Sequence, residues 1–278
     1  MRYLYHYTSL NTLALILSNQ TICFNNLLNV DDMEEAETND MGKFGRFVYV
    51  SCWTDDSEES IPLWNLYTPN MHGVRIRLPV FPFKKYSYKK GDLFLSEDIG
   101  TYIDLQQIYT DNQISIVPKE PHLVKVEYTD DPTKLFPKVK TESFEGAANL
   151  FLQARSLSDL RAKNVKVEYS FAELGKYKRS NWAFQREWRY IISTGPMGLK
   201  DLHPSTLAKQ QEVIRRIEDR SFLPPHQQLY LSIDSEALKD LEVVFGPRMN
   251  ASEKIMAKAL LTKYCPTAEY RESLLRIR

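Results

Sequence analysis

The sequence lacks most features that announce a membrane, secreted or metal-binding protein. Its 278 residues include three cysteines, Cys23, Cys52 and Cys265, which are far apart and form no Cys-x-x-Cys pair. Isolated cysteines in odd number indicate a reducing compartment and argue against a disulfide framework or a structural zinc site. No window approaches the roughly 18 apolar residues of a membrane span, and no apolar leader follows Met1. We therefore expect a cytoplasmic protein without membrane contact.

Charge imbalance and phosphate-binding loops are also missing. Lys and Arg together number 36, as do Asp and Glu, so no global field attracts nucleic acid or an acidic membrane. Neither a P-loop nor a G-x-G-x-x-G motif occurs, which leaves a glycine-rich phosphate cradle unsupported. The five histidines show no i, i+4 pair and no cysteine partner, so we expect no metal site. We interpret the acidic run at residues 31–35 as solvated charge rather than a cation site.

Hydrophobic and aromatic patterning predicts an α+β protein. Residues 3–7 form an aromatic strand pattern, and Ser9 is the expected N-cap of a helix at 10–18. Further strands are expected at 20–25, 47–53, 74–78, 123–128, 188–193, 228–233 and 241–245. Further helices are expected at 61–67, 145–163, 206–219 and after a capping box of Asn250 and Glu253. Strands and helices do not alternate regularly, so we expect one α+β domain over 1–278, with a less regular insertion at about 80–175.

His6 lies inside the aromatic strand pattern, immediately before the first expected helix. By itself this position favours a core histidine flanked by packing tyrosines. The alternative is a polar group held in place at the end of a strand. The rest of the sequence has to decide between these two interpretations.

A second candidate lies in the segment K-R-S-N-W-A-F-Q-R-E-W-R-Y at 178–190. If a strand begins near Phe184, then Gln185, Glu187 and Arg189 share one of its faces. A half-solvated sheet face accounts for this pattern. The alternative is that Glu187 points into a cleft with Gln185 one pleat away, where a carboxylate and a carboxamide can hold a ribose hydroxyl and orient a nucleophile.

A strand followed by a helix at about 50–67 supplies a third candidate. Ser51 can provide a hydroxyl, and Trp64 or Tyr67 an aromatic wall, although aromatic residues at helical spacing are more often part of the core. Cys52 competes as a nucleophile, but no local pattern provides a base for it. We expect Cys52 to be a buried structural thiol.

Four lysines, Lys84, Lys85, Lys89 and Lys90, alternate with aromatic residues at 81–90. Lysines that contact phosphates and rings that stack on bases are the ingredients of a surface for single-stranded nucleic acid. The competing interpretation is an exposed strand whose rings pack inward and whose lysines face water.

The order of these segments resembles a widespread bacterial family of formerly uncharacterised cytosolic proteins. That family typically reads H-Y-T-S near its start, N-D-P-F-E in a loop and E-x-E-x-R in a late strand. Here the corresponding stretches are L-Y-H-Y-T-S, D-D-M-E-E at 31–35, V-S-C-W, L-W-x-x-Y, H-G-V and W-x-x-Q-x-E-W-R. The resemblance extends to L-E-V-V-F-G-P-R-M-N-A-S-E-K-I and is weakest at about 80–175.

The same order resembles the ADP-ribosyltransferase fold of the His-Tyr-Glu type, which implies split antiparallel sheets with flanking helices. In that fold a first-strand histidine, commonly in H-G-T, holds the adenosine ribose of NAD, and a late glutamate binds the ribose at the reacting carbon. The resemblance assigns these roles to His6 with Thr8 and to Glu187 with Gln185. Tyr7 stands where the glycine is usual, within the NAD-binding stretch.

The remaining positions implied by the resemblance are a hydroxyl and a stacking ring on the second strand and the helix after it. They correspond to Ser51 for the hydroxyl and Tyr67 for the ring that stacks on nicotinamide. Trp64 is the reserve for the stacking role.

The resemblance implies a mono-ADP-ribosyltransferase that uses NAD, without a metal, to modify RNA, DNA or a protein. Cleavage of the nicotinamide–ribose bond passes through an oxocarbenium-like state, which a carboxylate near the ribose stabilises. Bacterial proteins of this fold and size are often toxins of toxin–antitoxin or anti-phage defence modules, so an antitoxin protein is an expected partner. Two alternatives stay open: an NAD hydrolase, and a non-catalytic nucleic-acid- or protein-binding module on the same fold.

Overall fold

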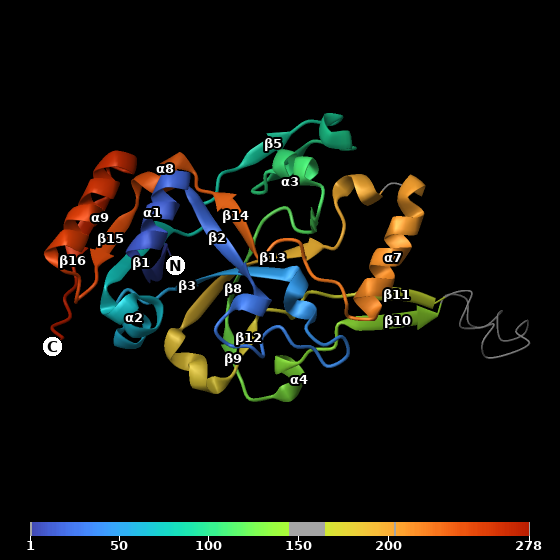
Figure 1. Cartoon of the computed structure of the whole chain (residues 1–278), viewed down its shortest axis with the longest axis horizontal. Helices are drawn as coiled ribbons and strands as arrows, with labels where there is room; N and C mark the ends of the chain where they lie inside the picture. The colour runs from blue at the N-terminus through green and yellow to red at the C-terminus, as the bar shows by residue number, and fades with distance from the viewer. Residues whose placement is uncertain (1, 145–164, 203, 278) are drawn as a thin grey trace, which may run out of the picture.

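Helices and strands are interleaved along the chain, of which the computed structural model describes residues 2–144, 165–202 and 204–277 (Figure 1). The α-helices are α1 (Leu10–Asn19), α2 (Ile61–Tyr67), α3 (Leu105–Asp111), α4 (Pro132–Leu135), α7 (Leu207–Glu218), α8 (Ser235–Lys239) and α9 (Ala251–Tyr264). The strands are β1 (Tyr3–Ser9), β2 (Thr21–Asn26), β3 (Val48–Thr54), β4 (Gly73–Pro79), β5 (Tyr86–Tyr88), β6 (Ile99–Thr101), β7 (Ser115–Ile116), β8 (His122–Lys125), β9 (Glu127–Tyr128), β10 (Lys140–Phe144), β11 (Val165–Tyr169), β12 (Tyr177–Lys178), β13 (Glu187–Gly195), β14 (Gln228–Ser232), β15 (Glu242–Phe245) and β16 (Glu269–Glu272). The predicted α+β class is confirmed.

Most elements predicted from patterning are present near their expected positions. Helix α2 has the predicted bounds, and Ser9 caps α1 as predicted, its Oγ accepting a hydrogen bond from the Thr12 backbone N–H at 3.0 Å. Asn250 and Glu253 form the predicted capping box of α9. The strand expected at 123–128 is interrupted and forms β8 and β9. The helix expected at 145–163 lies outside the described residues.

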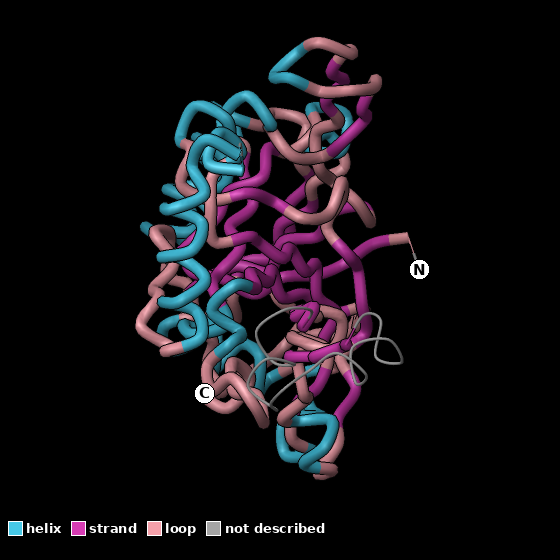
Figure 2. Tube along the Cα trace, turned by 90° about the vertical axis from the view of Figure 1, so that its right-hand side faces the viewer, coloured by secondary structure: helices cyan, strands magenta, loops and turns pink. Residues whose placement is uncertain are grey.

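Ten strands of the described chain form one sheet, ordered β14-β2-β3-β1-β4-β15-β16 along neighbouring strands. β13 joins it by pairing with β3, and β8 and β7 pair in turn with β13. The pairs are antiparallel except β15 with β16. Figure 2 shows the helices gathered mainly along one side of these strands.

The sheet splits around β3. One edge of β3 pairs with β13 along its whole length, from Thr54 to Val48. On the other edge, within the described residues, β1 pairs at one end (Tyr5 with Thr54) and β2 at the other (Asn25 with Val50). Residues 51–53 therefore border a gap between β1 and β2, and this gap positions the main pocket.

Helix α1 connects the two strands that diverge at this split. Its residues Leu13, Ile16 and Leu17 recur at helical spacing and are buried. Burial of each such side chain contributes roughly 1.5–3 kcal/mol relative to exposure. They join a core that includes strand residues on both sides of the split and Ala257 and Leu261 of α9, which lies against α1. The split is therefore spanned by a helix whose inner face is fixed in the core.

The segment at about 80–175 is tied to the main sheet although its elements are short. Its strands β7 and β8 pair with β13, and its strand β9 pairs in parallel with β12. A second core cluster on this side combines Phe44 and Phe47 with Val139 and Phe222. These contacts support the back of β13, the strand that carries Glu187.

Candidate functional site

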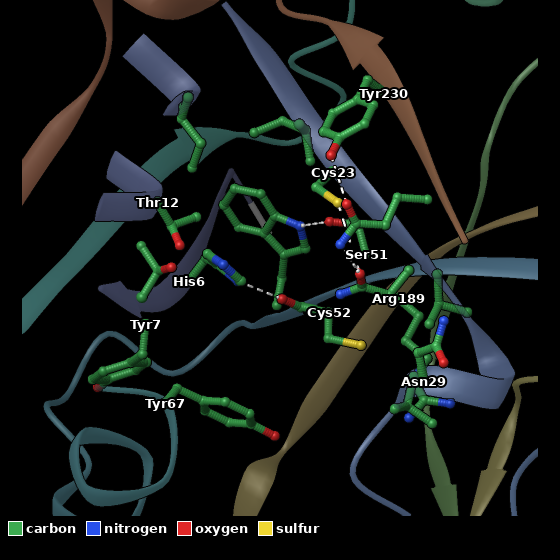
Figure 3. A pocket seen from close by; sticks show the side chains of 18 of the residues that line it. His6, Tyr7, Thr12, Cys23, Asn29, Ser51, Cys52, Tyr67, Arg189 and Tyr230 are labelled. Carbon is green, nitrogen blue, oxygen red and sulfur yellow. Dashed lines mark hydrogen bonds between the residues drawn. The ribbon is translucent and has the colours of Figure 1, made fainter. Parts of the chain in front are cut away.

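The main pocket, of about 460 Å³, lies at the split of the sheet (Figure 3). This volume is within the usual range for small-molecule and cofactor sites. Strands β1, β2, β3, β13 and β14 all contribute to its walls, as do α1 and the loop after β2. Of the residues predicted for the site, it is lined by His6, Tyr7, Thr8, Ser51, Tyr67 and Glu187. A small pocket of about 50 Å³ shares His6, Tyr67 and Glu187 and adds Gln185.

His6 of β1 contacts β3 in the gap between β1 and β2. Its Nδ1 donates a hydrogen bond of 2.8 Å to the carbonyl oxygen of Cys52, one of the β3 residues that border the gap. Its ring lies 5.1 Å from the ring of Trp53. Burial lowers the pKa of His6 below its usual value, against the opposing effect of this hydrogen bond. The ring is therefore neutral at pH 7 with its proton on Nδ1, and Nε2 is left as an acceptor.

Thr8 and Ser51 are buried side chains of the pocket wall. Thr8 belongs to the same strand as His6. The Oγ of Ser51 accepts a hydrogen bond from Trp53 Nε1 at 3.0 Å. Both residues line the main pocket, and their contact with NAD stays a prediction.

Tyr7 and Trp64 have packing roles in addition to, or in place of, the predicted contact with NAD. Their rings meet edge to face at 4.9 Å, and the Tyr7 hydroxyl accepts a hydrogen bond from the backbone N–H of Ser60 at 2.9 Å. Trp64 is fully buried, donates from Nε1 to Glu59, and does not line either pocket. Trp64 thus offers no ring face to a ligand, since the core covers it, whereas Tyr7 lines both pockets.

Tyr67 is the aromatic residue of α2 that reaches both pockets. Its hydroxyl accepts a hydrogen bond of 2.6 Å from Gln185 Nε2. Burial raises the pKa of Tyr67 above its usual value, and the Glu187 carboxylate raises it further. The phenol is therefore neutral and links α2 directly to the late segment.

The late segment contains a turn immediately before its strand. Residues Ser180–Gln185 form a 3-10 helix, Arg186 has the left-handed backbone angle φ 46°, and β13 begins at Glu187. The strand expected at 188–193 is present and begins one residue earlier, whereas a start near Phe184 does not hold, because this turn separates Gln185 from the strand. The half-solvated interpretation was also wrong, since Gln185, Glu187 and Arg189 are all buried.

Four buried charged residues form a closed set of contacts at the pocket wall, which we call the ionic ring: Glu35, Lys178, Glu187 and Arg189. All of them except Glu35 line the main pocket. Glu187 accepts from Arg189 Nε at 2.6 Å and from Lys178 Nζ at 3.1 Å. Glu35 closes the ring by accepting from Arg189 Nη1 and lying 3.3 Å from Lys178 Nζ, an ion-pair contact without hydrogen-bond geometry. No member is more than 9% exposed.

The ionic ring sets the charge of Glu187. Burial acts to raise the pKa of Glu187, but Arg189 and Lys178 outweigh it and hold that pKa at about 2. Glu187 is therefore an anion at every physiological pH. Burial raises the pKa of the neighbouring Cys52 thiol well above its usual range, and Glu187 raises it further. Cys52 therefore stays a neutral thiol, which is a poor nucleophile. It is half-buried rather than fully buried as expected, and it lines both pockets.

Glu35 and Lys178 were missed as site residues. Glu35 belongs to the acidic run that was interpreted as solvated charge, and that interpretation was wrong for this residue because it is buried against two cations. Its position does correspond to the final glutamate of the N-D-P-F-E pattern, a signal that the resemblance carried. Lys178 lies in the basic stretch K-Y-K-R, where nothing in the sequence separates a buried lysine from exposed ones.

The lysine cluster (Lys84, Lys85, Lys89 and Lys90) flanks β5 on both sides, with all four side chains exposed. Lys89 pairs with Asp98 at 2.9 Å, and Lys84 lies 5.0 Å from the centre of the Tyr86 ring. Phe83 is buried, so at least one ring of the stretch packs inward. None of the four lysines lines the main pocket. The role of the cluster as a nucleic-acid contact stays a prediction.

Comparisons with known proteins add one local similarity. A stretch of 72 residues, 26% of the chain, is 33% identical to the probable nicotinate-nucleotide adenylyltransferase of Rhizobium meliloti (strain 1021). The match spans 38% of that protein. No family model matches the chain, and no solved structure does.

Two features are absent from the described residues. No helix there is both long and apolar enough to cross a membrane. No group of three or more His, Cys, Asp or Glu side chains in the same residues is arranged to hold a metal ion.

Proposed function

We propose that this chain is a mono-ADP-ribosyltransferase that binds NAD in the main pocket and transfers ADP-ribose to a macromolecule. The observation that supports the proposal is the grouping of three candidate side chains around one pocket. His6 of β1, Tyr67 of α2 and Glu187 of β13 come from segments far apart in the sequence, and all three line one nucleotide-sized pocket. The order of motifs along the chain predicts the same grouping.

The chemical state of each group fits its proposed role. His6 has a free acceptor, Nε2, to receive a hydrogen bond from a ribose hydroxyl, which positions the sugar rather than transferring a proton. Tyr67 offers a neutral ring at the boundary of both pockets for the nicotinamide. Glu187 is a permanent anion, and a carboxylate beside the ribose stabilises the positive charge that develops as the glycosidic bond breaks.

The enzymatic alternative is an NAD hydrolase, in which water replaces the macromolecular acceptor. It would use the same three residues, because the bond that breaks is the same. The non-catalytic alternative keeps the pocket but assigns Glu187 to the ionic ring alone. The similarity to an adenylyltransferase covers a quarter of the chain and carries no proposal of adenylyl transfer.

Incubation of the purified protein with NAD labelled in its adenine separates these functions. Label on RNA, DNA or protein supports the transferase, free ADP-ribose without transfer supports the hydrolase, and unchanged NAD supports the non-catalytic module. Glu187→Gln should abolish transfer, whereas the matched change Glu236→Gln, at an exposed site on α8, should leave it intact. Full transfer activity in folded Glu187→Gln protein would refute the proposal.

A further inference from the structure

Lys178 makes more contacts with the proposed catalytic residues than any role in charge balance requires. Its Nζ donates to Gln185 Oε1 at 2.7 Å and to Glu187 Oε2 at 3.1 Å, and it lies 3.3 Å from Glu35 Oε1. The ring of Trp182 covers it, with 4.8 Å between Nζ and the ring centre. The residue is 3% exposed, so the ammonium is held almost entirely by protein groups.

Stability does not account for a lysine in this position. Removing ionic groups from water carries a large desolvation cost, and well-packed apolar residues in place of a buried ion pair are often as stable or more so. Glu187 already has a full counter-ion in Arg189, through a hydrogen bond of 2.6 Å. The Glu35–Lys178 pair therefore adds a second buried pair where one suffices for neutrality.

The positions of Gln185 and Glu187 explain why a lysine is buried here. Gln185 ends a 3-10 helix and Glu187 begins β13, with a left-handed residue, Arg186, between them. Because the two side chains do not belong to one strand, the pleat does not align them. One ammonium group bonds both, and Tyr67 holds the other end of the Gln185 carboxamide at 2.6 Å.

We infer that Lys178 is a positioning residue that locks Gln185 and Glu187 in a common orientation beside the pocket, with Glu35 as the counter-ion that holds Lys178. The inference rests on the proposed function, because it gives this pair its purpose in NAD cleavage. Lys178 touches the two proposed catalytic side chains and acts on the reaction through them.

Three variants separate positioning from charge balance. Lys178→Met leaves Glu35 and Glu187 facing one cation and lowers stability. Glu35→Gln removes the counter-ion while keeping an acceptor for Arg189. The double variant removes one charge of each sign, so the remaining Glu187–Arg189 pair is balanced and the protein should fold. If Lys178 only balances charge, the double variant regains activity; if it positions, activity stays low.

We expect kcat for NAD to fall about 100-fold in Lys178→Met, because misplacement of reacting groups has effects of this size. In the double variant kcat should stay within a few-fold of that low value. KM should change little in either variant. The control is Lys176→Met, which changes the half-buried lysine two residues away that pairs with Glu173. Recovery of near wild-type kcat by the double variant would overturn the inference, as would full kcat in folded Lys178→Met.

The pH profile provides a second readout. The groups that face Glu187 are Arg189 on its own strand, Lys178 of β12, Cys52 of β3, Tyr67 of α2 and Tyr128 of β9. Of these, Arg189 and Lys178 lower the pKa of Glu187 most, and a hydrogen bond with Cys52 also lowers it. Removal of Lys178 should therefore move the acid limb of kcat/KM to higher pH, and an unmoved limb counts against the inference.

A third readout does not depend on turnover. In the wild-type protein, the Gln185 side-chain amide should give one sharp pair of NMR signals, since both its ends are bonded. In the double variant these signals should broaden or shift toward free-amide values. If wild-type protein does not cleave NAD, the proposed function fails but this result still decides whether Lys178 positions Gln185. Unchanged Gln185 signals in the double variant refute the positioning role.

Discussion

His6 lines the pocket with one ring nitrogen hydrogen-bonded to the protein and the other able to accept a hydrogen bond from a ligand. Nδ1 is bonded to the Cys52 carbonyl, in the gap where neither β1 nor β2 pairs with β3. The carbonyl thereby fixes the tautomer, and burial keeps the ring neutral. The histidine is both a substitute for a missing strand contact and a directed acceptor.

His6→Ala should weaken NAD binding by roughly tenfold, the effect of removing one hydrogen bond of about 1 kcal/mol together with loosened geometry. Isothermal titration calorimetry with NAD checks this. His72→Ala is the matched control, because His72 is a histidine bonded to Glu253 and lines neither pocket. Equal affinity in the two variants would contradict the role assigned to His6.

Glu187 should make the free energy of unfolding depend on pH under acidic conditions. Its pKa is about 2 in the folded protein and lowered from an ordinary value near 4.5, so the unfolded chain binds the proton first as pH falls. The resulting stabilisation, on the order of 3 kcal/mol, is present above pH 4.5 and is lost as pH falls toward 2.

Urea unfolding at a series of pH values measures this dependence. In Glu187→Gln the slope of unfolding free energy between pH 4.5 and 2 should be shallower, because no group at this position gains a proton. A slope identical to wild type would show that Glu187 does not carry the effect.

At the same scale, the sequence indicated His6 and Glu187 but not the groups that surround them. A histidine and a glutamate are recognisable by their place in a motif order. Glu35 and Lys178 lie in runs of like charge, and such runs are normally solvated. Only the fold, which brings them together across residues 35–178, shows that these two are buried.

Helix α2 delivers Tyr67 to the pocket while Trp64, one turn earlier, anchors the helix in the core. The tyrosine has two separable properties, a ring for stacking and a hydroxyl bonded to Gln185. These properties can be tested one at a time.

Tyr67→Phe should keep KM for NAD within about threefold and lower kcat, because the ring remains and only the hydrogen bond to Gln185 is removed. Tyr67→Ala should also raise KM, since stacking of an aromatic ring on a base contributes about 1–3 kcal/mol. Steady-state kinetics of both variants provide the measurement. Equal KM values for the two would argue against stacking.

Helices and strands could be predicted where the sequence signal lies within a few neighbouring residues. The cap at Ser9, the helix at 61–67 and the capping box of α9 depend on neighbours within one turn. The turn between Gln185 and the start of β13 was not predictable in this way. Arg186 adopts a left-handed conformation without being glycine or asparagine, so nothing in the sequence marks the turn.

For the whole molecule, sequence patterning could not predict the pairing order of the sheet, because β3 pairs both with the N-terminal strands β1 and β2 and with the distant β13. A net charge of zero likewise does not reveal a local concentration of positive charge such as the lysine cluster. If this cluster guides a nucleic-acid acceptor, its contribution should be electrostatic and separate from NAD chemistry.

Replacing all four cluster lysines by glutamine should reduce transfer to RNA while leaving the rate of NAD cleavage in water unchanged. The salt dependence of RNA binding should become shallower, by up to about 0.7 in log–log slope for each phosphate that the variant no longer neutralises. Filter binding over a range of salt concentrations measures the slope. The control replaces Lys43, Lys239, Lys258 and Lys263, which belong to other segments; the same reduction there would show a general charge effect.

The split in the sheet has a consequence for what the protein can accommodate. β1 and β2 are fixed to one edge of β3 at Thr54 and Val50, so the opening extends over four residue steps, roughly 13 Å at about 3.3 Å per step. A distance set by a continuous strand does not adjust as a loop would. We therefore expect the length of this opening to be constant and any ligand that binds there to be selected by its fit to that length. Replacing Ser51 by side chains of graded size would test this expectation.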